Sequence, residues 1–302
     1  MEQYPKSLQK FESQFSTEDA CLKYLFDLRW PNGFTCPKCH STRSWTTNRH
    51  TYYCAACNHQ TSVTAGTIFH GSRKPLRLWF SVIWYITSEK YGTNAMTIRR
   101  ALQLGSYKTA WAYLNKLRQV MVRPGREKLS GTVEVDETYL GGKKAGKRGR
   151  GAQGKSLVAI AVEDAENGMG RIRLQRINDA SGDSLKAFIK ANIAERSTIR
   201  TDSWQGYNGI EQDGYSHIVI KESADVGENM LQLVHIVAGL LKRWILGTYQ
   251  GSIKPAFLDY YLDEFTFRFN RRKSHFRGKL FYRLLQQAIL YTPLEKKLCA
   301  HR

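Results

Sequence analysis

The sequence predicts a mixed α/β domain preceded by a small metal-binding ribbon and a helical segment. Three observations support this prediction. Short β-branched runs begin at Gly131, two Cys-x-x-Cys pairs lie within residues 31–70, and apolar residues recur at helical spacing over residues 75–123. Period-two runs indicate strands, and a period of three to four indicates helices. The expected domains are an N-terminal helix (1–30), a ribbon (31–70), a helical segment (71–125) and the α/β domain (130–290).

The composition favours a nucleic-acid partner. Lys and Arg number 46 against 26 Asp and Glu in 302 residues, which gives a net charge of +20. An excess of this size and sign indicates a polyanionic partner. The sequence has no run of about 20 apolar residues and no apolar signal core after Met1. We therefore expect a cytoplasmic protein with no membrane contact and no small-molecule substrate.

The first two domains are expected to be an amphipathic helix over Leu8–Trp30 and a zinc ribbon. Two knuckles, separated by fourteen residues, each turn two thiolates towards one ion. Six cysteines in a cytosolic chain favour metal over disulfides, and four thiolates give zinc a tetrahedral, closed site. The predicted ligands of this structural zinc are Cys36, Cys39, Cys54 and Cys57.

The helical segment resembles a helix-turn-helix over Met96–Arg123. Gly105 gives the turn, and Ser106 can cap the second helix. Its predicted DNA-contacting residues are Lys108, Lys116 and Arg118. A plain helical hairpin with a solvated basic face is the alternative for this segment.

A glycine-rich basic loop lies further along, inside the α/β domain. Glycines let a backbone come close to phosphates, so we expect this loop to contact the DNA backbone; a solvated, disordered loop is the alternative. The predicted contacts are Lys143, Lys144, Lys147, Arg148 and Arg150.

The α/β domain is expected to form a mixed five-stranded sheet with flanking helices. The candidate strands are Thr132–Tyr139, Ser156–Glu163, Gly170–Ile177, Thr198–Thr201 and His217–Lys221, with a helix from about Ser181 to Glu195.

Two aspartates of this domain each follow a β-branched run and precede turn-forming residues. They are Asp136 and Asp202. Two carboxylates that meet in a fold can hold a pair of divalent ions for phosphoryl transfer. Glu134 and Glu137 flank Asp136, and we expect both to point away from the face that carries it, although Glu137 could point into the site if it lies at a strand end.

Four motifs occur in an order that is more specific than any one of them. They are Val133–Gly142, Thr201–Tyr207, Leu241–Gly251 and Leu258–Arg272. With the cysteine knuckles, they make the chain similar to the zinc-ribbon family of bacterial insertion-sequence transposases. The resemblance runs as far as Gly278–Gln287 and implies a DDE-type, integrase-like catalytic domain with the ribonuclease-H-like fold.

The resemblance also implies the metal ligands of the active site. Asp136 would be the first acidic ligand and Asp202 the second, and both would bind magnesium or manganese. The third acid of the family usually precedes a Lys or Arg by seven residues, which is about two helical turns. Counting back seven residues from Lys242 gives His235. The signature is therefore Asp-Asp-His followed by Lys242, and Glu228 is the alternative third residue.

The resemblance further implies the partners and the reaction. Lys242 and Arg243 would contact phosphates, and the double-stranded DNA partners would be terminal inverted repeats and target DNA. Such proteins join two DNA ends, so we expect a homo-oligomer on DNA that is associated with the nucleoid. The predicted function is DNA cleavage and strand transfer. The alternatives are a decayed or domesticated DNA-binding protein and a nuclease of the same fold.

Overall fold

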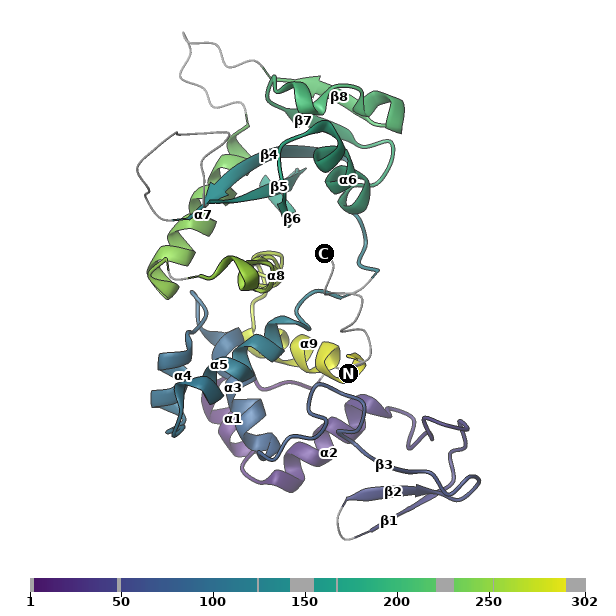
Figure 1. The fold of residues 1–302 in the computed structure, drawn as a ribbon. Helices are drawn as coiled ribbons and strands as arrows, with labels where there is room; N and C mark the ends of the chain where they lie inside the picture. Colours follow the sequence, from purple (N-terminus) through teal and green to yellow (C-terminus); the bar gives the residue numbers. More distant parts are fainter. Residues whose placement is uncertain are drawn as a thin grey trace. The chain divides into compact units, whose positions relative to one another are not determined.

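The computed structural model describes residues 3–47, 50–123, 125–141, 155–166, 168–220, 231–251 and 253–291. The chain packs as two compact units, whose helices and strands are labelled in Figure 1. Met1–Arg123 together with Ser274–Arg302 form one unit, here called the ribbon–helix unit. Pro124–Lys273 form the other, here called the sheet unit.

The ribbon–helix unit begins with two helices where the sequence predicted one. Helix α1 spans Leu8–Gln14, and α2 spans Glu18–Arg29. The break falls at Thr17, whose hydroxyl accepts a hydrogen bond from the Ala20 amide at 3.2 Å. A threonine cap starts a new helix because it satisfies an N–H that has no partner within the helix. The prediction of one continuous helix was therefore wrong between α1 and α2.

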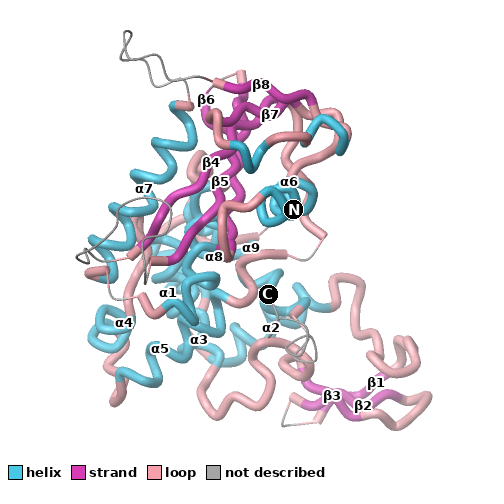
Figure 2. Tube along the Cα trace, turned by 45° about the horizontal axis from the view of Figure 1, so that its top comes forward, coloured by secondary structure: helices cyan, strands magenta, loops and turns pink. Residues whose placement is uncertain are grey.

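A three-stranded antiparallel sheet forms the ribbon and appears as a separate magenta group in Figure 2. Its strands are β1 (Ser44–Thr46), β2 (Thr51–Cys54) and β3 (Gln60–Ser62). The Arg29 guanidinium of α2 donates to the carbonyl oxygens of Ser62 at 3.1 Å and Val63 at 2.7 Å. These bonds attach the third strand of the ribbon to the end of α2.

The remaining helices of this unit form an apolar bundle. They are α3 (Leu76–Ser88), α4 (Ala95–Ala101), α5 (Tyr107–Arg118) and α9 (Arg277–Leu290). Phe281 of α9 lies against Phe80 and Trp84 of α3, with ring centroids 5.6 Å and 6.0 Å apart. Because α9 packs with the N-terminal helices, the sheet unit ends at Lys273 rather than at residue 290.

The sheet unit contains the predicted mixed five-stranded sheet. Strands β4, β5 and β6 form an antiparallel meander, and β7 and β8 run parallel to β4. The order across the sheet is β6-β5-β4-β7-β8. The bounds are β4 Thr132–Leu140, β5 Ser156–Ala165, β6 Gly168–Ile177, β7 Thr198–Thr201 and β8 Ser216–Val219.

Helices cover both faces of this sheet, and Figure 1 shows α6 and α7 on opposite sides of it. One core lies between the strands and α6, and the other lies between the strands and helices α7 and α8. The helices are α6 (Gly182–Asn192), α7 (Gln232–Tyr249) and α8 (Leu258–Phe269), with 3-10 turns at Gln205–Tyr207, Ile210–Asp213 and Pro255–Phe257.

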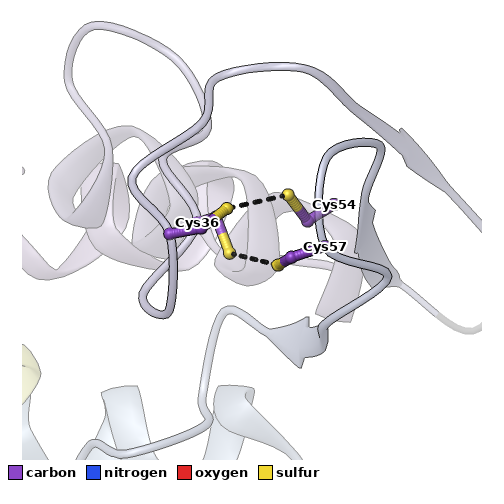
Figure 3. A group of neighbouring side chains, drawn as sticks. Cys36, Cys54 and Cys57 are labelled. Carbon is purple, nitrogen blue, oxygen red and sulfur yellow. Dashed lines mark hydrogen bonds between the residues drawn. The ribbon is translucent and has the colours of Figure 1, made fainter.

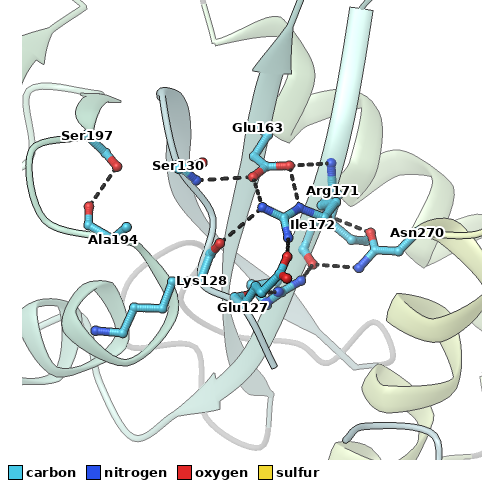
Figure 4. Close-up of polar contacts among 10 residues, drawn as sticks. Glu127, Lys128, Ser130, Glu163, Arg171, Ile172, Ala194, Ser197 and Asn270 are labelled. Atoms are coloured by element: carbon cyan, nitrogen blue, oxygen red, sulfur yellow. Dashed lines mark hydrogen bonds and ion pairs between the residues drawn. The ribbon is translucent and has the colours of Figure 1, made fainter. Parts of the chain in front are cut away.

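Side-chain contacts protect the edge strand β6 (Figure 4). The Asn270 side chain accepts from the Ile172 amide at 2.7 Å and donates to its carbonyl at 3.1 Å. Arg171 forms an ion pair with Glu163 of β5 at 2.6 Å. Occupied backbone groups at an edge cannot pair with another chain, so the Asn270 side chain prevents further strand pairing at Ile172.

No helix among the described residues is both long and apolar enough to cross a membrane.

Candidate active site and zinc site

The four cysteines of the ribbon meet at one point, as predicted (Figure 3). Their Sγ atoms all lie within 4.8 Å of one another. The Cys36 and Cys57 sulfurs are 3.7 Å apart, and those of Cys39 and Cys54 are 3.4 Å apart. A tetrahedral zinc with Zn–S bonds of about 2.3 Å places its sulfurs roughly 3.8 Å apart. The cluster therefore fits a structural zinc, and four ligands leave no open position for catalysis.

The sheet brings the two predicted catalytic aspartates to adjacent strands: Asp136 lies in the middle of β4, and Asp202 directly follows the end of β7. Glu134 of β4 pairs with Arg200 of β7 in parallel register. Asp136 and Asp202 each follow two residues later, so the two carboxylates lie at neighbouring positions on neighbouring strands. Burial raises the pKa of Asp136 to about 6, and the charges of Glu137 and Asp202 act in the same direction. Accumulated negative charge of this kind favours a bound cation.

Helix α7 places His235 beside the first aspartate. The His235 Nε2 atom lies 3.3 Å from the Asp136 Oδ2 atom. The His235 side chain is 40% exposed and that of Asp136 is 20% exposed, so both are accessible. Lys242 lies two turns further along α7 and is exposed. Among the described residues, only the four cysteines form a group of three or more ligands within 4.8 Å.

The loop after β7 holds Asp202 through its own neighbours. The Trp204 amide donates to the Asp202 carboxylate at 3.0 Å, and the Trp204 indole donates to the Ala180 carbonyl at 2.8 Å. Gly206 has no room for a side chain, because a Cβ there would lie 2.7 Å from the Ala180 oxygen. This loop therefore fixes the position of Asp202 by packing.

A buried tyrosine ties the same loop to β4. The Tyr207 hydroxyl donates to the Glu137 carboxylate at 2.8 Å. Burial raises the pKa of Tyr207 well above its ordinary value, and the adjacent Glu137 charge adds to this effect. Tyr207 therefore keeps its proton and remains a donor. Glu137 points to the α6 side of the sheet, away from Asp136, as expected.

Glu134 was expected to point away from the face of Asp136, and this expectation was wrong. Residues two apart on a strand share a face, and both Glu134 and Asp136 contact α7. The Glu134 carboxylate accepts hydrogen bonds from the amides of Leu233 at 2.8 Å and Val234 at 3.1 Å. It therefore caps the first turn of the helix that carries His235. The signal that was overlooked is the strand period of two.

We expect Glu134→Ala to destabilise the sheet unit. The same substitution should loosen the start of α7, the helix that holds His235 beside Asp136. One buried and one partly buried amide of α7 would lose their acceptor, which costs roughly 2–4 kcal/mol. Glu134→Gln keeps an oxygen acceptor and should recover most of that loss. Urea denaturation of the three proteins measures the effect. Equal unfolding midpoints for the wild type and the alanine variant would show that the cap contributes nothing.

The predicted DNA-contacting residues differ in their exposure to solvent. Lys108 and Lys116 are exposed on α5, and Arg243 is exposed on α7. Arg118 is only 1% exposed, so the prediction that it contacts DNA was wrong. It lies one turn after Leu114 on the buried side of α5. The residues Lys143, Lys144, Lys147, Arg148, Arg150 and Glu228 lie outside the described residues.

The strand order and the cysteine cluster define a protein with a ribonuclease-H-like domain and a zinc ribbon. Residues 128–270 match the family described as ISXO2-like transposase domain. Residues 16–60 match the transposase zinc-ribbon domain. The chain belongs to the zinc-ribbon, DDE-type family of insertion-sequence transposases. The family and the fold predicted from the sequence are therefore confirmed.

Several known proteins are similar to this chain. An uncharacterized protein in transposable element ISH50 of Halobacterium salinarum is 25% identical over 267 residues, which are 82% of this chain and 89% of the relative. The catalytic core domain of BIV integrase has a TM-score of 0.33 and 15% identity, covering 57% of this chain and 99% of its own. The Mos1 strand transfer complex has a TM-score of 0.29 and 11% identity, covering 70% and 75%.

Proposed function

We propose that this chain is an active DNA transposase that binds the terminal inverted repeats of its element and then cuts and joins DNA. The observation that carries the proposal is the 3.3 Å approach of His235 to Asp136. It brings the third member of the predicted signature to Asp136, whose carboxylate also lies near enough to Asp202 to be affected by its charge. A histidine that merely filled the core would be buried, whereas this side chain is 40% exposed.

Asp136, Asp202 and His235 are the residues that would hold the catalytic ions. Oxygen ligands suit magnesium and manganese, and an imidazole suits manganese at least as well. Such ions activate a hydroxyl nucleophile and stabilise the leaving oxygen at phosphorus. The chain itself holds Asp202 through the Trp204 amide and supports the start of α7 through Glu134.

The positive charge of the chain supports DNA as the substrate. A net charge of +20 favours a polyanion. Exposed lysines lie on α5 in the ribbon–helix unit, and Lys242 and Arg243 lie on α7 in the sheet unit. We assign recognition of the terminal repeats to the ribbon–helix unit with its zinc, and phosphate contact near the reaction to α7. Assembly of two or more copies on DNA belongs to the same proposal.

A strand-transfer assay tests this function. We expect wild-type protein to join an inverted-repeat end to a second DNA in magnesium or manganese. Joining by His235→Ala should fall about 100-fold or more, because loss of even an outer-shell partner of a metal ligand costs about one to two powers of ten. Ile236→Ala is the matched control, because Ile236 is the exposed neighbour in the same helical turn.

Each other outcome of the assay has a distinct meaning. Joining by His235→Ala at the wild-type rate would transfer the third role to Glu228 or another acid. Cutting without joining by the wild type would identify a nuclease of the same fold. DNA binding with neither reaction would identify a domesticated or decayed binding protein.

A further inference from the structure

A basic hollow lies in the ribbon–helix unit between α5 and the loop before α3. It has a volume of about 400 Å³. Three cationic side chains line it, and no acidic side chain does. Its lining includes Ser72, Arg73, Trp79, Lys108, Tyr113 and Lys116. The three cations are exposed, whereas the two aromatic side chains are buried.

The aromatic side chains form a fixed floor for this hollow. The rings of Trp79 and Tyr113 meet edge to face, with centroids 4.3 Å apart. The Trp79 indole N–H donates to the Ser72 hydroxyl at 2.9 Å, which holds the loop against α3. The Lys116 ammonium lies 5.9 Å from the Trp79 ring centroid. The floor therefore provides a contact for the Lys116 ammonium before a ligand binds.

One polar group in the floor has no partner. Tyr113 is 5% exposed, and its hydroxyl is buried without a hydrogen bond. Buried polar groups are nearly always paired, so an exception calls for an unseen ligand or water. Burial also raises the pKa of Tyr113 to about 12, so the hydroxyl keeps its proton and remains a donor. Tyr113 lines the same hollow as the three cations, and a donor on such a residue suits an oxyanion.

We propose that this hollow binds successive phosphate groups of one DNA strand. The inference rests on the proposed function, because it assumes that the ribbon–helix unit binds DNA. Lys108 and Lys116 are eight residues apart on one face of α5, or about 12 Å along the helix. Cations spread over that length match a strand with successive phosphates better than one small ion. Arg73 contributes from the facing loop.

The dependence of DNA affinity on salt tests the proposal in the full-length protein. Each lost phosphate contact lowers the slope of log K against log salt by about 0.9. We expect Arg73→Gln and Lys116→Gln each to lose about this amount, as measured by fluorescence anisotropy with an inverted-repeat duplex. Lys10→Gln is the matched control, because it removes an exposed charge of the same unit outside the hollow. Its slope should equal that of the wild type.

The variant Tyr113→Phe distinguishes two explanations of the unpaired hydroxyl: that it binds a ligand, or that it is a buried polar group without a function. We expect DNA affinity to fall about tenfold, as for loss of a bond to a charged group, while the melting temperature stays level or rises. Unchanged affinity with a higher melting temperature would remove the hydroxyl from the site.

Three results separate the possible failures. If the salt slopes of the Arg73 and Lys116 variants equal that of the Lys10 control, the proposal that the hollow binds phosphate is overturned. The proposal that the protein binds DNA would remain. Failure of the wild type to bind DNA would overturn the proposed function itself. Inorganic phosphate could raise the melting temperature of the wild type but not that of Arg73→Gln, while the salt slopes for DNA binding are the same for the variants and the control. This result would assign the hollow to free phosphate rather than to DNA.

Discussion

Asp136→Asn is expected to abolish DNA cutting and joining while leaving DNA binding intact. An amide oxygen is a far weaker ligand for a divalent ion than a carboxylate. Metal ions contribute several kcal/mol to such reactions, and each 1.36 kcal/mol is tenfold in rate, so a loss of about 1,000-fold or more is expected. Removing a negative charge near the phosphates should leave duplex affinity equal or higher. Strand-transfer and anisotropy assays measure the two effects separately.

The same substitution should make the metal-free protein more stable, which a purely structural aspartate would not do. The folded state raises the pKa of Asp136 from 3.8 to about 6. Its charged form is therefore destabilised by roughly 3 kcal/mol, an order-of-magnitude figure from about 1.4 kcal/mol per pKa unit. Because the folded pKa exceeds the unfolded one, this cost is absent below pH 4 and is complete above pH 6.

The predicted stability gain is therefore present at pH 7 and disappears near pH 4. Urea denaturation of the wild type and of Asp136→Asn at both pH values, with a chelator to remove metal, tests the direction of this stability change. Asp183→Asn is the control, since Asp183 is an exposed acid in the first turn of α6. Joining by Asp136→Asn at the wild-type rate would remove Asp136 from the chemistry. Lower stability at pH 7 would mean that its charge supports the fold.

Zinc removal is expected to unfold the ribbon while leaving the sheet unit folded. The ribbon strands are only three or four residues long, so they bury too little apolar surface to fold alone. Structural zinc contributes an apparent 10–16 kcal/mol in isolated zinc-finger peptides, so roughly this scale of binding energy is at stake here. A strong chelator should expose residues 31–62 to proteolysis, and added zinc should restore protection.

Cysteine variants give the matched comparison for zinc. Cys54 is a predicted ligand and Cys21 is a buried cysteine of α2 outside the cluster. We expect native mass spectrometry to find one zinc per chain in the wild type and in Cys21→Ala, and none in Cys54→Ser. DNA-end recognition should be lost with the metal. An intact, protease-resistant ribbon in the chelated protein would show that packing alone holds it.

The strands of the sheet unit were predictable because each is a short β-branched run between turn residues. Strand β4 was predicted at Thr132–Tyr139 and is found at Thr132–Leu140. The proximity of Asp136 and Asp202 was implied by the resemblance to the family rather than by these runs, and it depends on the parallel register of β4 and β7. The order of the motifs, rather than any one of them, indicated the family.

Other features could not be predicted, because they depend on tertiary partners. The sequence placed residues 277–290 in the α/β domain, because nothing in their pattern reveals that they form a helix that packs on α3. The burial of Arg118 depends on which face of α5 meets the bundle, and a charged residue there looks solvent-exposed in sequence. The face on which Glu134 lies could be predicted from the strand period of two. Its role as a cap could not, because that role depends on where α7 begins. The roles of the candidate site residues remain predictions.

The placement of α9 has a consequence for synthesis of the protein on the ribosome. Residues 1–123 emerge first, yet the ring of Phe281 that completes their aromatic cluster arrives some 150 residues later. The module proposed to read DNA ends therefore finishes folding only after the module proposed to cut them has been translated. A chain that is released early would lack α9, and its ribbon–helix unit would be incompletely folded. Few truncated products would therefore compete with the complete protein for its DNA ends.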